Sequence, residues 1–265
     1  MGSFFIKNSA RCRLEDPSAT TFRMHAHDSY EIFYFLSGDA FYYVEGTPYN
    51  LRPGDIMLMR KSESHVLSLR SNAPYERIVV NFDVSVSSTG ELSKLLRVFN
   101  DRPLGAFNHY SAALFPTNHW LYYLTKICEY NGETEYQISF LLPLLAELSE
   151  CFDSVKKLKQ VEEPDQITSI IGYINHNITE ELSLASLCSL FYMSQAHMNR
   201  IFKKSTGSTV WNYIVIKRLL LAREMLSAGK TPTEVYTFCG FQDYTTFFRA
   251  YKKHFGISPK KDQCQ

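Results

Sequence analysis

Between Phe22 and Phe82 the chain shows short runs of alternating apolar and polar residues, rich in aromatic and β-branched side chains and interrupted by glycine, proline and asparagine. Alternation with period two is typical of strands that bury one face, and the interruptions are turn residues. So many short strands joined by turns predict a small β-sandwich or β-barrel. The predicted strands are Thr21–His25, Glu31–Ser37, Ala40–Glu45, Tyr49–Leu51, Asp55–Met59, His65–Arg70 and Glu76–Phe82.

The apolar spacing changes from strand-like to helix-like after residue 85. Residues 85–90 read as a loop and Glu91–Phe99 as a short helix, while Asn118–Tyr130 and Glu135–Phe152 carry apolar residues at helical intervals. Pro143 indicates a kink or a late start in the last helix. Two interpretations of these helices stay open: they pack on the outside of the β-domain, or they form a helical dimer interface.

A polar, charged run at 156–164 predicts an interdomain linker, and helical periodicity continues from there, with Asp165 as a candidate cap. The predicted fold class is therefore multidomain α+β. A first domain at 1–155 holds a barrel at about 1–85 and helices at about 91–155. An all-helical domain follows at 165–265.

The helical domain contains a duplicated pattern. Arg200–Gly207 reads R-x-aromatic-K-K-x-x-G, and the same pattern recurs 49 residues later at Arg249–Gly256. Each copy follows a short helix, a turn and a capping residue, Ser194 or Asp243, which is the order of a helix-turn-helix. A solvated amphipathic helix is the alternative for each copy, but the duplication and the caps together favour two DNA-binding units.

The second helix of each unit carries side chains suited to DNA. Arginine pairs with guanine and asparagine with adenine, whereas lysine suits phosphate. The predicted base-reading residues are Gln195, Ala196, Asn199, Arg200, Tyr244, Thr245, Thr246 and Arg249, and the predicted phosphate contacts are Ser194, Lys203, Lys204, Lys252 and Lys253. A long helix at Thr209–Ala228 separates the units, so we expect both to enter successive major grooves, roughly 34 Å apart.

Charge is unevenly divided along the chain. The net charge is +1, but residues 165–265 carry 12 basic against 7 acidic residues, a net charge of +5 that fits a polyanionic partner. The six cysteines lack C-x-x-C spacing and read as reduced thiols. No signal peptide and no window of 18 apolar residues is evident, so we expect a cytoplasmic protein without a membrane partner.

Histidines cluster in the β-rich half as His25-x-His27-x3-Glu31, followed by Gly38 and later by His65. Strand alternation places His25 and His27 on one face, and Glu31 begins the next strand, so these three can converge as transition-metal ligands do. This constellation resembles the cupin motif, in whose metal-binding members the positions of His25, His27, Glu31 and His65 are the ligands. Cupin-like sensors commonly carry the pattern without a functional metal, so we expect no cofactor and no catalytic residues. The predicted small-molecule pocket is lined by His25, His27, Tyr30, Glu31, Phe33 and His65.

The segment Leu182–Pro259 resembles the DNA-binding domain of AraC/XylS-type bacterial transcription regulators. The motifs that carry the resemblance are Arg218-x3-Ala222-x3-Leu226, Gly240-Phe241-x-Asp243, Phe247-x-Arg249-x-Tyr251-Lys252-Lys253 and Gly256-Ile257-Ser258-Pro259. Two positions depart from the family pattern: Ala196 is smaller than usual, and Tyr236 replaces a small residue.

The resemblance implies a regulator that binds double-stranded DNA and is controlled by a small-molecule effector, such as a sugar, in a cupin-like N-terminal domain. It further implies a homodimer, with RNA polymerase as an additional candidate partner. Two alternatives remain: a cupin metalloenzyme, either oxygenase or isomerase, fused to a DNA-binding domain, and an architectural DNA-binding protein without an effector.

Overall fold

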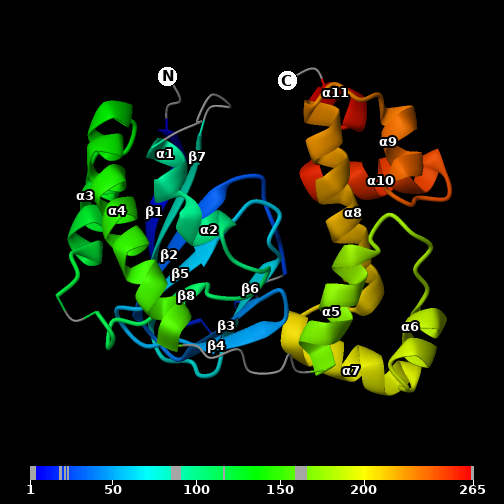
Figure 1. The fold of residues 1–265 in the computed structure, drawn as a ribbon, viewed down its shortest axis with the longest axis horizontal. Coiled ribbons are helices and arrows are strands. Elements are labelled where there is room, and N and C mark those ends of the chain that lie inside the picture. The colour runs from blue at the N-terminus through cyan, green and yellow to red at the C-terminus, as the bar shows by residue number, and fades with distance from the viewer. Residues whose placement is uncertain are drawn as a thin grey trace. The chain divides into compact units, whose positions relative to one another are not determined.

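The computed structural model describes residues 4–17, 20, 22, 24–84, 91–115, 117–158 and 166–263 (Figure 1). Its contacts divide the chain into two compact units. The first comprises 1–22, 29–63 and 67–163, and the second comprises 23–28, 64–66 and 164–265. The predicted fold class is confirmed: a cupin-like β-domain with helices precedes an all-helical domain. Among the described residues, no helix has the length and apolar character needed to cross a membrane.

Two antiparallel sheets build the β-domain. One has five strands in the order β1-β7-β2-β5-β8, and the other has three in the order β4-β3-β6. Among the described ladders, none closes these sheets into the continuous barrel that the sequence suggests. The strands are β1 (Phe4–Leu14), β2 (Tyr30–Ser37), β3 (Ala40–Val44), β4 (Thr47–Asn50), β5 (Ile56–Met59), β6 (His65–Leu69), β7 (Tyr75–Val84) and β8 (His109–Tyr110).

Strand alternation gives the five-stranded sheet two distinct faces. On β2, Ile32 and Tyr34 belong to one apolar cluster, whereas Phe33 and Phe35 belong to another. The second cluster is completed by residues of the three-stranded sheet, including Tyr42, so it fills the space between the sheets. Successive side chains on a strand point to opposite faces, which explains this division.

Helices cover the other face of the five-stranded sheet (Figure 1). They are α1 (Glu91–Leu95), α2 (Arg97–Asn100), α3 (Trp120–Glu129) and α4 (Thr134–Leu158). Trp120, Leu124 and Leu145 are fully buried in the same cluster as Ile32. Packing on the β-domain is therefore the main role of these helices. Tyr122 and Tyr136 nevertheless stay 55% exposed on their outer surface.

Several predicted boundaries in this domain are wrong. The strand β1 was not expected, because a register shift between Ile6 and Asn8 breaks its alternation. The two-residue strand β8 is too short to give a periodic signal. The helix predicted at Glu91–Phe99 is interrupted, giving α1 and α2. Pro143 lies within α4, which already begins at Thr134 and is not a late start.

Two other predictions fall partly on residues that the structure does not describe. Of the strand predicted at Thr21–His25, only His25 pairs, in an isolated bridge with His65, and residues 21 and 23 lie outside the described residues. The helix α4 continues through Leu158, three residues into the predicted linker. The predicted loop at 85–90, the rest of the linker and the candidate cap Asp165 lie outside the described residues.

The second unit is built from seven helices among its described residues. The capping residues expected from the sequence, Ser194 and Asp243, accept backbone N–H bonds at the starts of their helices, and the side chains of Ser183 and Thr231 do the same at two others. The helices are α5 (Gln166–His176), α6 (Leu184–Leu190), α7 (Gln195–Thr206), α8 (Val210–Ser227), α9 (Pro232–Phe238), α10 (Tyr244–Phe255) and α11 (Pro259–Gln263).

The duplicated pattern corresponds to α7 and α10. Its aromatic position is buried in both helices, as Phe202 and Tyr251. The Tyr251 hydroxyl donates a 2.6 Å hydrogen bond to Asp262 on α11. The closing glycines, Gly207 and Gly256, end the two helices in the left-handed conformation.

Arg218 ties both helix-turn-helix units to α8. Its side chain is 4% exposed and donates to three carbonyl oxygens. Two belong to the segment between α5 and α6, Ile178 at 2.9 Å and Glu180 at 2.6 Å, and the third is Gly240 at 2.6 Å, in the turn of the second unit. Because all three guanidinium nitrogens are used, the buried charge is well compensated.

The turns of the two units contain the same left-handed position. It is Tyr192 (φ 53°) in the first unit and Gly240 (φ 77°) in the second. A Cβ at Gly240 would lie 2.7 Å from Nη2 of Arg218, so this glycine is required both by backbone conformation and by space. Tyr192 is 96% exposed, so its ring gives no packing energy to offset the conformational cost.

We expect Arg218→Met to destabilise the second unit by about 3 kcal/mol, because three buried carbonyls lose a charged donor. Arg218→Lys should recover part of this loss. The measurement is hydrogen–deuterium exchange of the α8 and α10 amides in the full chain. Unchanged protection in Arg218→Met would contradict the role assigned to this side chain.

The substitutions Tyr192→Gly and Gly240→Ala should change stability in opposite directions. Tyr192→Gly removes the cost of holding a non-glycine residue in the left-handed conformation, so it should raise the free energy of unfolding by about 1 kcal/mol. Gly240→Ala should lower the free energy of unfolding by more than that. Urea denaturation of the full chain, compared with wild type, measures both. A loss of stability in Tyr192→Gly would show that the exposed ring makes a contribution that its 96% exposure does not indicate.

Candidate functional site

The recognition helix α7 presents most of its predicted DNA-binding residues to solvent. Gln195, Ala196 and Arg200 are exposed, and Asn199 is half-buried. The predicted phosphate contacts Lys203 and Lys204 are also exposed, in the last turn of the helix. Ser194 caps the helix by accepting from the backbone N–H of His197, so its oxygen already has a structural role.

One member of this face was missed by the sequence reasoning. His197 is exposed, and its Nδ1 lies 3.0 Å from Nη2 of Arg200, one turn further along α7. An arginine can only donate, so Nδ1 accepts and the ring proton resides on Nε2. The contact holds the Arg200 guanidinium at the helix surface. A histidine three residues before an arginine was a signal present in the sequence.

The second recognition helix, α10, exposes Tyr244, Thr245 and Arg249. The backbone N–H and the hydroxyl of Thr246 each donate to the Asp243 carboxylate at 2.7 Å. These bonds, the backbone one first, lower the pKa of Asp243. Thr246 takes part in the cap and is itself exposed, and Lys252 and Lys253 are exposed in the last turn.

Tyr236 is accommodated beneath the start of α10. Its ring lies 5.7 Å from that of Tyr244 and 6.4 Å from that of Phe247, between ring centroids. Tyr244 also contacts Phe248, at 6.1 Å. The larger side chain at position 236 thus belongs to an aromatic cluster that includes a predicted base-reading residue.

The predicted effector residues do not all lie on one face of the β-domain. Phe33 is fully buried in the cluster between the sheets, with its ring 4.7 Å from Tyr42. Tyr30 belongs to the helix-covered cluster, where it stacks on Phe82. The parity of β2 therefore places these two side chains on opposite faces of the sheet.

Polar groups line the space between the sheets beside Phe33. Glu31, 5% exposed, accepts from Asn81 Nδ2 at 2.9 Å and from the Tyr42 hydroxyl at 3.3 Å. Burial, followed by the Glu31 charge, raises the pKa of Tyr42 well above its ordinary value, so this phenol remains a donor.

Arg77 is a basic group of this interior, and the sequence reasoning missed it because the residue lies within an ordinary strand pattern. Its guanidinium lies 5.4 Å from the ring of Phe22 and 6.0 Å from that of Phe33. Nη1 donates to the Tyr75 hydroxyl at 3.3 Å, while Nε is buried without a hydrogen-bond partner among the described residues. A buried donor of this kind calls for an explanation.

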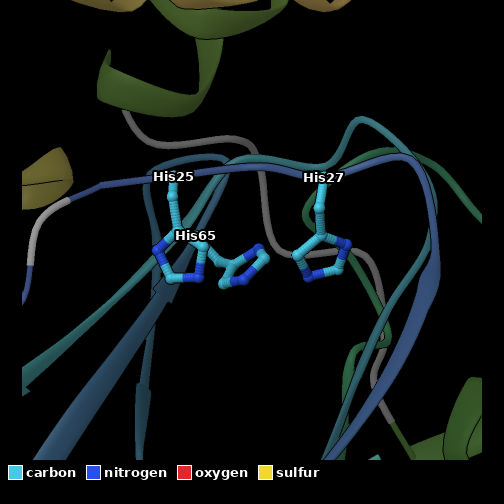
Figure 2. A group of neighbouring side chains, drawn as sticks. All are labelled: His25, His27 and His65. Carbon is cyan, nitrogen blue, oxygen red and sulfur yellow. The ribbon is translucent and has the colours of Figure 1, made fainter. Parts of the chain in front are cut away.

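The three predicted histidines converge (Figure 2). His25 and His65 face each other in an antiparallel bridge, with backbone hydrogen bonds of 3.0 and 2.9 Å, and His27 follows on the same side as His25. Ring centroids are 4.3 Å apart for His25 and His65 and 5.1 Å for His27 and His65. One ring nitrogen from each lies within 4.8 Å of the others, and Glu31 is outside this group.

Sequence models of two protein domains match the chain. Residues 10–89 match the AraC-like ligand binding domain, and residues 187–263 match a helix-turn-helix domain. The chain belongs to the AraC/XylS-type family of transcription regulators. It is a DNA-binding transcription regulator with an N-terminal ligand-binding domain.

Relatives of this AraC-type regulator align along nearly its whole length. The probable transcriptional regulator LumQ of Photobacterium leiognathi is 25% identical over 90% of this chain and 91% of its own. The transcriptional activator RhaS of Pectobacterium carotovorum is 23% identical over 97% of this chain and 93% of its own. The crystal structure of ToxT from Vibrio cholerae O395 aligns with 99% of this chain and 97% of its own at 16% identity, with a TM-score of 0.41.

Proposed function

We propose that this regulator reads two segments of DNA with α7 and α10 and that a small molecule bound between its two β-sheets controls the binding. The observation that carries the proposal is the pair of exposed basic helices, each capped, each anchored by a buried aromatic residue and both connected to α8. Lysines in the last turns neutralise phosphates, while Arg200 and Arg249 contact base edges.

The effector in this proposal occupies the interior beside Phe33. Arg77 supplies a cation with an unused donor, Glu31 and Asn81 supply polar groups, and aromatic rings supply apolar surface. This combination suits a small molecule that carries an anionic group, because a guanidinium in an apolar interior favours a carboxylate or phosphate. A sugar acid or sugar phosphate satisfies this chemistry better than a neutral sugar.

Control requires that the effector bind two arrangements of the protein with different affinity. We propose a homodimer in which each copy supplies one pair of recognition helices. The outer surface of α3 and α4, where Tyr122 and Tyr136 are exposed and Tyr130 stacks on Tyr136 and Phe140, suits contact with a second copy. RNA polymerase is a further partner that this class of activity requires when transcription is activated.

We further propose that the protein acts in the cytoplasm as a regulator rather than as an enzyme. The descriptions of LumQ and RhaS as a regulator and an activator support this choice over the metalloenzyme alternative. Five cysteines described as free thiols fit a reducing compartment.

The base-reading role of Arg200 has a specific consequence. Arg200→Ala should weaken binding to the preferred sequence by about 1–3 kcal/mol and binding to random DNA much less. Lys203→Ala should weaken both equally and reduce the salt dependence by about one counterion. The measurement is fluorescence anisotropy at several salt concentrations, using a site selected from random oligonucleotides by the wild-type protein.

Lys230→Ala serves as the matched control, because this exposed lysine lies between α8 and α9, outside both recognition helices. It should leave both affinities almost unchanged. Equal losses on selected and random DNA for Arg200→Ala would refute base reading by this residue.

The effector proposal is tested with Arg77→Met, which keeps the apolar part of the side chain and removes the charge. A thermal-shift panel of neutral sugars, sugar phosphates and small carboxylic acids should find stabilising compounds only among the anions, and Arg77→Met should abolish the shift. Arg70→Met is the control, since this half-exposed arginine follows the end of β6 and pairs with Asp39. Equal stabilisation of wild type and Arg77→Met by one compound would exclude Arg77 as its receptor.

A further inference from the structure

The two recognition helices differ in chemistry at one pair of corresponding positions. The duplicated pattern is offset by 49 residues, so Gln195 and Asn199 of α7 correspond to Tyr244 and Phe248 of α10. The members of each pair are four residues apart, so they lie on the same side of their helix. The first unit therefore carries two amides where the second carries two aromatic rings.

We propose that the aromatic pair of α10 reads thymine through its C5-methyl group, and that Tyr236 holds the ring of Tyr244 in place for this contact. The proposal rests on the proposed function, because it requires α10 to enter the major groove. There an amide side chain recognises adenine by hydrogen bonds, whereas an apolar side chain recognises thymine by contact with its methyl group. The two units therefore read different chemical features of the DNA.

Tyr244 lies where a recognition helix meets the bases. It is the first residue of α10, directly after the cap Asp243, and its side chain is 39% exposed. The N-terminal end of a recognition helix is the part that contacts base edges. The rings of Tyr244 and Phe248 lie 6.1 Å apart and are inclined by 40°, so together they form one apolar surface. Thr245 is exposed beside them and contributes a further methyl group.

Tyr236 supports this surface from α9. Its ring packs edge-on against that of Tyr244, with 5.7 Å between the centroids and 76° between the planes. The Tyr244 ring also lies 6.0 Å from that of Phe247, which is fully buried. A ring held by several neighbours loses little conformational freedom when DNA binds, so Tyr236 preorganises the contact. The small residue that Tyr236 replaces would leave this side of the ring without a neighbour.

The test compares thymine with uracil, which lacks only the C5-methyl group and pairs with adenine in the same way. A site is selected from random oligonucleotides by the wild-type full chain, and each thymine in it is then replaced in turn by deoxyuridine. At one or more positions the replacement should weaken wild-type binding about fourfold, the effect expected for one methyl group left unburied. Tyr244→Ala should bind the thymine and uracil versions of those positions equally, as measured by fluorescence anisotropy.

The matched control is Tyr244→Phe, which removes only the hydroxyl group and should keep the fourfold ratio. Tyr236→Ala should reduce the ratio, whereas a purely structural effect on α10 would weaken binding to both DNAs equally and leave the ratio unchanged. Arg200→Ala, in the other recognition helix, should lower the affinity for both DNAs and preserve the ratio at these thymines.

The proposal is overturned if no uracil replacement weakens wild-type binding, if the ratio persists in Tyr244→Ala, or if Tyr244→Phe abolishes it. The first of these outcomes needs no variant, so it does not depend on how a substitution affects folding. An unchanged ratio in Tyr236→Ala would refute the positioning role of that residue. Failure of the proposed function gives a different result, because the wild-type protein would then select no sequence at all.

Discussion

Three hydrogen bonds from one buried guanidinium hold the DNA-binding unit together. Arg218 donates to carbonyls in the segment before α6 and in the turn before α10, so one side chain of α8 binds both helix-turn-helix units. The close approach leaves room only for glycine at position 240. Burying a charge is costly unless it is compensated, and here each of the three guanidinium nitrogens donates to a carbonyl. The three hydrogen bonds are therefore cooperative, because the loss of one leaves part of the buried charge uncompensated. Two recognition helices can read DNA together only if they are held at a fixed separation, and the contacts of Arg218 with both units help to hold them.

The N-terminal domain depends on a different constraint, the alternation of side chains along β2 and β7. One face buries Ile32 and Val80 beneath α3 and α4, and the opposite face presents Glu31, Phe33 and Arg77 to the space between the sheets. The helices can therefore seal one side of the sheet while the other remains polar enough to recognise a ligand. The same parity places Tyr30 among the apolar contacts of the sealed side.

The residues of the cupin-like motif occupy two separate places in this protein. Its histidines converge at the bridge between His25 and His65, while its glutamate turns toward Asn81 and Tyr42. Ligand spacing in a sequence identifies which residues are near one another in a fold family. How each side chain is oriented depends on partners elsewhere in the chain: those of Glu31, Tyr42 and Asn81, lie 11 and 50 residues away.

Local sequence determined much of this protein by itself: the helix caps Ser194 and Asp243, the buried aromatic positions of the repeat, most strands after residue 30 and the division into a β-rich and a helical part. Caps, periodicity and turn glycines act over a few residues, so they can be recognised in the sequence without knowledge of the tertiary structure. Tertiary structure alone decided the rest. A bulge concealed β1, and Arg77 became an interior cation because its side of the strand faces the second sheet. These outcomes depend on pairing between distant segments, whose register no local pattern specifies.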